Sequence, residues 1–183
     1  LKIDSFLVPG KALILYGPRR AGKTTLLKSY LDSCGLRYRL ETGDDVRIRN
    51  LLGSGDLKQI VAFAEGFELV AIDEAQQIPD IGMGLKILVD HLPALRIIAT
   101  GSSSFDLAGA IGEPLTGRKR TLTLFPISQM ELKRKFSSYD MRQRLEEYLV
   151  YGSYPETVMA DGRKEKIELL EELVGSYLLK DVL

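Results

Sequence analysis

The chain has 183 residues, which is enough for one sizeable hydrophobic core with a helical appendage but hardly for two full domains. Its 25 basic and 25 acidic residues give a net charge of about zero, so the strong positive field typical of dedicated nucleic-acid-binding proteins is missing. One cysteine and one histidine exclude intramolecular disulfides and cysteine-based metal clusters and disfavour a zinc site.

Short apolar runs alternate with helical patterns along the first two-thirds of the chain. The run "ALILY" at 12–16 is typical of a parallel strand buried on both faces, and a helical pattern follows it at 23–35. Further strands are predicted at 38–41, 69–72 and 97–100 and within "RTLTLFPIS" ahead of Pro126, with helical segments between them. This alternation predicts an α/β fold with a parallel sheet and right-handed crossovers.

The last third of the chain has a different pattern. Helices are predicted at 129–136, 140–152 and 163–183, with a turn around Gly152 and Pro155. We therefore expect an α/β core at 1–128 and a helical region at 129–183. The helical pattern runs to the last residue without a cap, so we also expect a further C-terminal part.

Nothing in the sequence predicts export or insertion into a membrane. No apolar stretch approaches the roughly 18 residues that span a bilayer, and the N-terminus lacks the layout of a signal peptide. We expect a cytoplasmic protein.

The stretch "GPRRAGKTT" at 17–25 lies between the first strand and the first helix and fits the pattern G-x-x-x-x-G-K-[ST]. Glycines let a loop wrap phosphate closely, and the helix N-terminus adds partial positive charge. Lys23 would neutralise the terminal phosphates and Thr24 would coordinate Mg²⁺, backed by Thr25. The rest of the predicted phosphate loop is Gly17, Pro18, Arg19, Arg20, Ala21 and Gly22. Such a loop binds mainly through its backbone, so the two arginine side chains are expected to point to solvent more than to phosphate.

Polar residues follow two other apolar runs. "LVAIDEAQ" delivers Asp73 and Glu74 to the carboxyl end of a buried strand, where Asp73 would order Mg²⁺ and Glu74 would activate water. The alternative for this pair is a helix cap with first-turn acidity. "IIATGSSS" places Thr100, Ser102 and Ser103 along the same edge, where a hydroxyl would sense the terminal phosphate or the attacking water. The alternative there is an ordinary turn, because serine and threonine are common turn formers.

Taken together, "GPRRAGKT", "LVAIDEAQ", "ATGSSS" and "LTGRKRTLTLFPISQMEL" resemble the AAA+ type of P-loop ATPase. They are similar to a bacterial and archaeal group in which "DE-x-Q" is followed by "TGSS", then by "GR", a strand and "PxS". The resemblance implies a five-stranded sheet with an extra strand between those carrying the phosphate loop and the acidic pair. It also implies a small helical region and, in full-length members, a further C-terminal domain. The tail lacks a clear helical arginine that would act as the second sensor of typical AAA+ proteins.

The expected function is Mg²⁺-dependent ATP hydrolysis that rearranges a partner or an attached C-terminal domain, with self-association in the full-length protein. The alternatives are a non-enzymatic, nucleotide-gated interaction module and the motor half of a DNA-associated protein. ATP is favoured over GTP because the only asparagine, Asn50, precedes leucine and so cannot form the guanine-reading N-K-x-D. A P-loop kinase usually lacks an acidic residue in the position of Glu74.

Arg118, in "TGRKR", matches the "GR" of the group and would be an arginine finger acting in the same chain or in a neighbour. Its alternative is an ion pair with an acidic residue at the sheet edge. The basic runs at 117–120 and 133–136 are expected to be solvated rather than a nucleic-acid patch. His91 and Cys34 are expected to have no chemical role.

Overall fold

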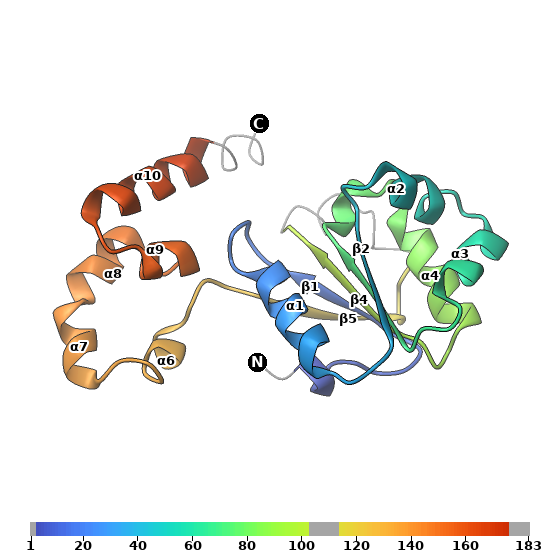
Figure 1. Cartoon of the computed structure of the whole chain (residues 1–183), viewed down its shortest axis with the longest axis horizontal. Coiled ribbons are helices and arrows are strands. Elements are labelled where there is room, and N and C mark those ends of the chain that lie inside the picture. The colour runs from blue at the N-terminus through green and yellow to red at the C-terminus, as the bar shows by residue number, and fades with distance from the viewer. Residues whose placement is uncertain (1–2, 103–113, 176–183) are drawn as a thin grey trace. The chain divides into compact units, whose positions relative to one another are not determined.

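The computed structural model describes residues 3–102 and 114–175. Its contacts divide the chain into two compact units. One unit comprises residues 1–17 and 23–123, and the other comprises residues 18–22 and 124–183. The first is an α/β unit and the second is built from short helices (Figure 1). The division into domains at residue 128 stays a prediction.

The first unit contains a five-stranded parallel sheet with the strand order β2-β3-β4-β1-β5. The predicted α/β fold is therefore confirmed, and it is consistent with a P-loop NTPase of the AAA type. In this order β4 lies between β1, which precedes the phosphate loop, and β3, which ends at the acidic pair. Strand β4 is thus the extra strand that the resemblance implied. The strands are β1 (Ala12–Tyr16), β2 (Tyr38–Thr42), β3 (Leu69–Asp73), β4 (Arg96–Gly101) and β5 (Lys119–Thr123).

Helices cover both faces of the sheet, which explains why the central strands are mostly apolar. Helix α1 (Lys23–Ser33) lies on one face, and α2 (Val46–Leu52), α3 (Leu57–Ala64) and α4 (Ile81–His91) lie on the other (Figure 1). Successive residues of a strand point to opposite faces. Leu13 accordingly packs with Leu27 of α1, while Ile14 packs in the cluster that contains Leu85 of α4. Two short 3₁₀ turns, Ile3–Ser5 and Ala75–Gln77, complete the described elements of this unit.

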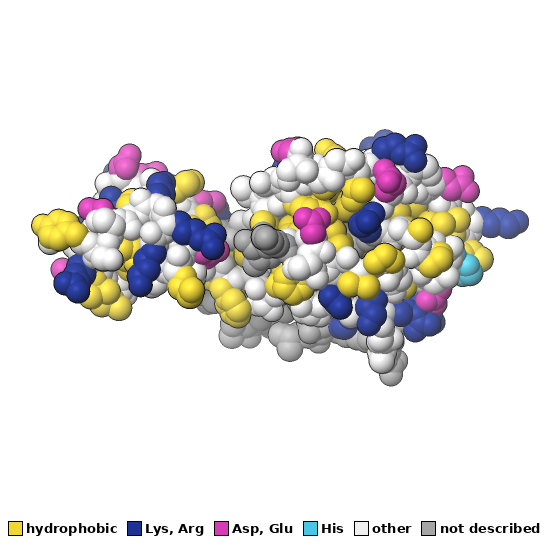
Figure 2. Space-filling model, turned by 90° about the horizontal axis from the view of Figure 1, so that it is seen from below, with side chains coloured by type: hydrophobic (Ala, Val, Ile, Leu, Met, Phe, Trp, Pro, Cys, Tyr) yellow, Lys and Arg dark blue, Asp and Glu magenta, His cyan; other side chains and the backbone are white. Residues whose placement is uncertain are grey.

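The second unit contains α6 (Gln129–Leu132), α7 (Ser138–Gln143), α8 (Leu145–Tyr151), α9 (Pro155–Met159) and α10 (Arg163–Leu173). Several hydrophobic side chains lie on its surface (Figure 2). Two helix predictions were too long. The helix predicted at 129–136 ends at Leu132, because the amides of Arg134 and Lys135 bond to carbonyls three residues back instead of four.

The helix predicted at 140–152 is two helices, α7 and α8. A capping box between Ser137 and Asp140 starts α7 two residues earlier than expected, and Arg144, with ψ near 4°, separates it from α8. The helix predicted at 163–183 is described as far as Leu173, and residues 176–183 lie outside the described part of the chain. Within the residues described, no helix has both the length and the apolar character that a bilayer crossing requires.

Candidate functional site

The phosphate-loop pattern forms the predicted strand, loop and helix. All five residues of β1 are buried, and α1 begins at Lys23 directly after Gly22, whose φ of +94° is one that other residues rarely adopt. The side chain of Lys23 is only 5% exposed, and its Nζ donates a hydrogen bond to the carbonyl oxygen of Gly17 at 2.9 Å. The only cation of the first turn is thus held against the start of the loop.

Three segments of the first unit meet at the carboxyl ends of β3 and β4. The Thr24 hydroxyl, in the first turn of α1, donates a hydrogen bond to Oδ2 of Asp73 at 2.8 Å. The hydroxyl of Thr100, which is fully buried in β4, donates to the other oxygen, Oδ1. Asp73 therefore uses both carboxylate oxygens to join α1 and β4 to the end of β3. The structure thus brings Thr24 together with Asp73, the other residue predicted to hold Mg²⁺, and with Thr100, which was predicted at the same edge of the sheet as Asp73.

Glu74 is held in an unusual backbone conformation beside this cluster. Its φ of 49° and ψ of 41° lie in the left-handed region, and its amide donates to Oδ1 of Asp73 and to Oγ1 of Thr100, both at 3.2 Å. The side chain of Gln76 donates to Oε2 of Glu74. Strain of this kind costs free energy and persists only where the surroundings impose it. Asp73 and Thr100 therefore fix the backbone of Glu74, and Gln76 contacts its carboxylate.

Two residues that position Glu74 were not given a role from the sequence. The amide of Gly43 donates to the carbonyl oxygen of Asp73 at 2.8 Å, and a Cβ at this position would lie 2.3 Å from the carbonyl oxygen of Glu74. Only glycine fits so close an approach. The other is Gln76, the last residue of "DE-x-Q". The motif was visible in the sequence, but the contact between the amide and the carboxylate was not.

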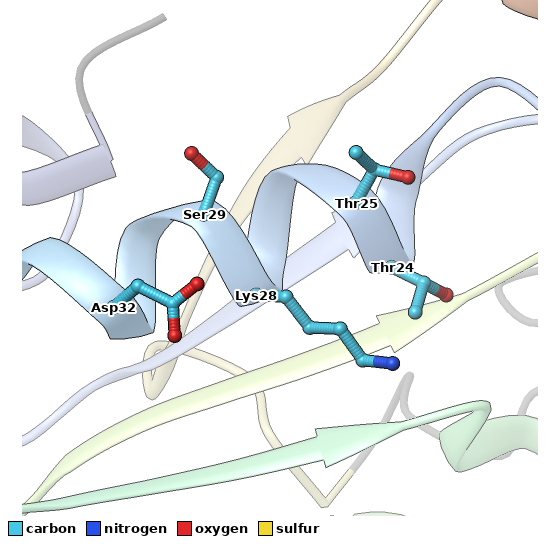
Figure 3. Close-up of a pocket in the computed structure, with 5 residues that line it drawn as sticks. All are labelled: Thr24, Thr25, Lys28, Ser29 and Asp32. Atoms are coloured by element: carbon cyan, nitrogen blue, oxygen red, sulfur yellow. The ribbon is translucent and has the colours of Figure 1, made fainter.

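Ser102 and Thr25 differ in their burial. Ser102 is buried, with 2% exposure, one residue beyond the end of β4. Thr25 is exposed and, with Thr24, borders a shallow pocket along the outer side of α1 (Figure 3). The other lining residues are Lys28, Ser29 and Asp32. Ser103 lies outside the described residues.

The arginine next to the middle of the phosphate loop does not point to solvent. Residues 18–22 group with the second unit, and within that unit Arg20 forms ion pairs with Glu156 of α9, at 3.0 Å, and with Glu172 of α10. Its side chain is 21% exposed, and its φ is 59°. The expectation that Arg20 points to solvent is therefore wrong. The ion pairs join positions more than 130 residues apart, which a local sequence pattern cannot reveal.

Arg118 lies at the opposite end of the strands from Asp73. It precedes β5 directly, its carbonyl accepts a hydrogen bond from the amide of Ala12 at the start of β1, and its Nε donates to Oδ1 of Asp90 at 2.6 Å. The ion pair is the structural alternative that the sequence left open. Because β5 has five residues at about 3.3 Å each, Arg118 is about 16 Å from the carboxyl end of its strand. The structure does not bring it together with Asp73 and Glu74.

The described residues contain no group of three or more histidine, cysteine, aspartate or glutamate side chains able to hold a metal ion by themselves. Thr24 and Asp73 nevertheless present a hydroxyl and a carboxylate oxygen 2.8 Å apart. Oxygen atoms of this kind suit Mg²⁺, which is usually bound by one or two protein ligands together with substrate phosphates and water. The residues present therefore fit Mg²⁺ held jointly with a nucleotide.

A family model and several known proteins match most of this chain. The family model of the AAA domain matches residues 9–133, which include the phosphate loop, the acidic pair and all five strands. An uncharacterized protein of Mycobacterium tuberculosis is 35% identical over 172 residues, covering 93% of this chain and 36% of that protein. One of Methanocaldococcus jannaschii is 26% identical over 199 residues, covering 98% and 44%, and one of Haemophilus influenzae is 27% identical over 198 residues, covering 92% and 45%. The chain thus spans less than half the length of these relatives.

Proposed function

Because the chain belongs to the AAA domain family, which indicates nucleotide binding, we propose that it binds ATP together with Mg²⁺ and hydrolyses it. In this proposal, hydrolysis rearranges a partner or another part of the whole protein. The hydrogen bond between Thr24 and Asp73 is the observation that supports it most directly, because it joins the loop that would hold phosphate to the carboxylate that would hold the metal.

The binding residues would act through charge and through the backbone of the loop. Lys23 would exchange its hydrogen bond with the Gly17 carbonyl for one with a terminal phosphate oxygen, a charge-assisted contact of greater strength. Thr24 and Asp73 would hold Mg²⁺, which when bound neutralises phosphate charge. The amides of the phosphate loop would surround the phosphates. Thr25, at the edge of the loop, and Ser102, at the end of β4, would contribute further hydroxyls.

Glu74 is the residue we propose as general base. Its carboxylate would take a proton from the attacking water, and the Gln76 contact would fix its direction. Thr100 would keep Asp73 in place and orient the Glu74 backbone through its hydroxyl. Because the backbone of Glu74 is fixed by its neighbours, its carboxylate would already have the orientation that proton transfer from water requires. This supports hydrolysis rather than binding alone.

Arg118 fits a catalytic role only if it acts on a neighbouring copy. Its place at the amino end of β5 separates it from the acidic pair of its own chain, whereas its side chain is 40% exposed and accessible to another molecule. Arg118→Ala should then bind ATP normally and fail to hydrolyse it. Mixing it with Lys23→Ala in the full-length protein should restore part of the turnover at shared interfaces. Intact hydrolysis by Arg118→Ala alone would remove this role.

The test of the proposed function is steady-state phosphate release from Mg-ATP by the full-length protein, with and without DNA. We expect release without DNA that is lost in Lys23→Ala and kept in Lys58→Ala, the same change at an exposed lysine of α3. ATP binding without release would favour the non-enzymatic interaction module. Release that requires DNA would favour the DNA-associated motor.

A further inference from the structure

Arg20 is the third residue of a turn within the phosphate loop. The amide of Ala21 donates to the carbonyl oxygen of Pro18 at 3.3 Å and closes this turn. The φ of Arg20 is 59°. A positive φ at the third position of a turn usually requires glycine, because the Cβ of any other residue then lies close to the backbone. An arginine at such a position needs surroundings that hold it there.

Two carboxylates on two helices of the second unit hold this arginine. Its Nη1 donates to Oε2 of Glu156 in α9 at 3.0 Å, and its Nη2 donates to Oε1 of Glu172 in α10. By its contacts, the loop segment 18–22 groups with these helices. An isolated exposed ion pair contributes little to stability. A guanidinium that is 21% exposed and shared by two carboxylates is held more firmly, because both ends of its fork are engaged.

The backbone conformation that these ion pairs stabilise is one that suits an anion. Arg20 and Gly22 have φ values of 59° and 94°, while the φ of Ala21 between them is not positive. Alternation of this kind turns successive backbone amides toward one side and forms a concave site for phosphate. Without the ion pairs, residue 20 would favour a negative φ. The competent loop conformation would then be less populated, and the apparent affinity for phosphate would fall in proportion.

We propose that Arg20 is a positioning residue of the phosphate loop rather than a ligand of the phosphate. Glu156 and Glu172 hold its side chain, and the loop thereby keeps its phosphate-binding backbone before ATP arrives. This inference rests on the proposed function, which places the phosphates of ATP in this loop. Both carboxylates lie beyond residue 133, where the match to the AAA domain ends. The helical unit therefore takes part in nucleotide binding through this arginine.

Two substitutions at position 20 separate a role through the backbone from a direct contact with phosphate. Arg20→Gly and Arg20→Gln both lose the guanidinium, but only glycine adopts a positive φ without strain. Isothermal titration calorimetry on the full-length protein measures the affinity of each variant for Mg-ATP. We expect Arg20→Gly to bind within about threefold of wild type, and Arg20→Gln to bind at least about tenfold more weakly.

The carboxylates provide the second half of the experiment. Combining Glu156→Gln with Glu172→Gln leaves the arginine in place but removes both ion pairs, so affinity for Mg-ATP should fall at least about tenfold. Adding Arg20→Gly to this pair should restore the affinity of Arg20→Gly alone, because glycine does not need the ion pairs. The matched control combines Glu165→Gln with Glu171→Gln, which removes two exposed carboxylates of α10. Its affinity should stay within about twofold of wild type.

Circular dichroism confirms that each variant is folded before its affinity is used. Equal losses of affinity in Arg20→Gly and Arg20→Gln would overturn the proposal, in favour of a direct contact between the guanidinium and phosphate. Tighter binding by the variant without Glu156 and Glu172 would also overturn it, because the carboxylates would then withhold Arg20 from the phosphates. Unchanged affinity in every variant would overturn it as well. Absence of ATP binding by the wild type would instead refute the proposed function.

Discussion

Both ends of the parallel sheet carry charged side chains, but these side chains differ in their exposure and in the number of their hydrogen-bond partners. At the carboxyl ends of β3 and β4, Asp73 accepts hydrogen bonds from Thr24 and Thr100, and Thr100 is fully buried. At the amino end of β5, Arg118 and Asp90 form one ion pair with side chains 40% and 34% exposed. The first arrangement joins three segments, whereas the second joins two side chains in contact with water.

This difference in exposure and in hydrogen bonding indicates which of the two sites has a function. Even a partly buried carboxylate such as that of Asp73 loses hydration, which costs free energy unless several donors compensate, so its geometry is closely determined. An exposed ion pair contributes little and tolerates change. We therefore expect substitutions at the carboxyl ends to alter nucleotide chemistry and substitutions at the amino end to alter stability slightly.

The largest effect is expected from Lys23→Ala. The substitution removes the buried ammonium that would pair with the terminal phosphates, so affinity for Mg-ATP should fall about 100-fold or more. Isothermal titration calorimetry measures this affinity, with Lys58→Ala at an exposed lysine of α3 as the control. Unchanged affinity in Lys23→Ala would refute the assignment of the phosphate loop.

Asp73→Asn should act through the metal. An amide keeps an acceptor for Thr24 but loses the negative charge, so the Mg²⁺ concentration that half-saturates ATP binding should rise by about tenfold to 100-fold. A Mg²⁺ titration at constant ATP gives this value. Asp80→Asn, at an exposed carboxylate seven positions further along the chain, is the control. Equal Mg²⁺ requirements in the two variants would place the metal elsewhere.

Gly43→Ala tests whether the close approach of the backbone positions Glu74. The new Cβ would lie 2.3 Å from the Glu74 carbonyl oxygen and 3.2 Å from the Cβ of Gln77, so something must shift. We expect a loss of about 1–3 kcal/mol of stability in urea unfolding, together with slower turnover. Gly162→Ala is the control, because nothing lies within 4 Å of a Cβ there and its φ is −125°. Equal stability of the two variants would show that the backbones of Gly43 and Glu74 can move apart at little cost in free energy.

The smallest effect is expected from Asp90→Asn at the amino end. The Arg118 guanidinium donates to Asp90 and holds the pKa of its carboxyl below the usual range. A depressed pKa stabilises the fold above the unfolded-state value of about 3.9, and this contribution is lost as pH falls through the folded-state value. Thermal midpoints of wild type and variant should differ by about 2 °C or less at pH 7 and converge below about pH 4. A much larger difference in thermal midpoint at pH 7 would show that the ion pair at the amino end contributes more to stability than an exposed pair should.

Much of the first unit could be predicted from sequence because parallel strands covered on both faces are continuous apolar runs. The run "ALILY" is β1 as expected, and the strand expected at 69–72 is β3, which extends one residue further to Asp73. The meeting of Thr24 with Asp73 was predictable for the same reason, since the carboxyl ends of parallel strands share one edge. The position of Arg118 was also implicit in the sequence, because a residue just before a parallel strand lies at the amino end.

Other features depend on contacts that no local pattern contains. Gly43 acquires its role only because β2 pairs with β3 and its following loop passes the Glu74 carbonyl. Arg20 finds acidic partners on two distant helices.

The most direct measurement combines ATP binding and single-turnover hydrolysis in Glu74→Gln. The amide preserves the size of the side chain but cannot accept the proton of the attacking water. With Glu65→Gln, an exposed glutamate, as control, we predict ATP affinity within about twofold of wild type in both variants and a hydrolysis rate lower by about 100-fold or more only in Glu74→Gln. Hydrolysis by Glu74→Gln at the wild-type rate would contradict the assignment of this carboxylate as the catalytic base.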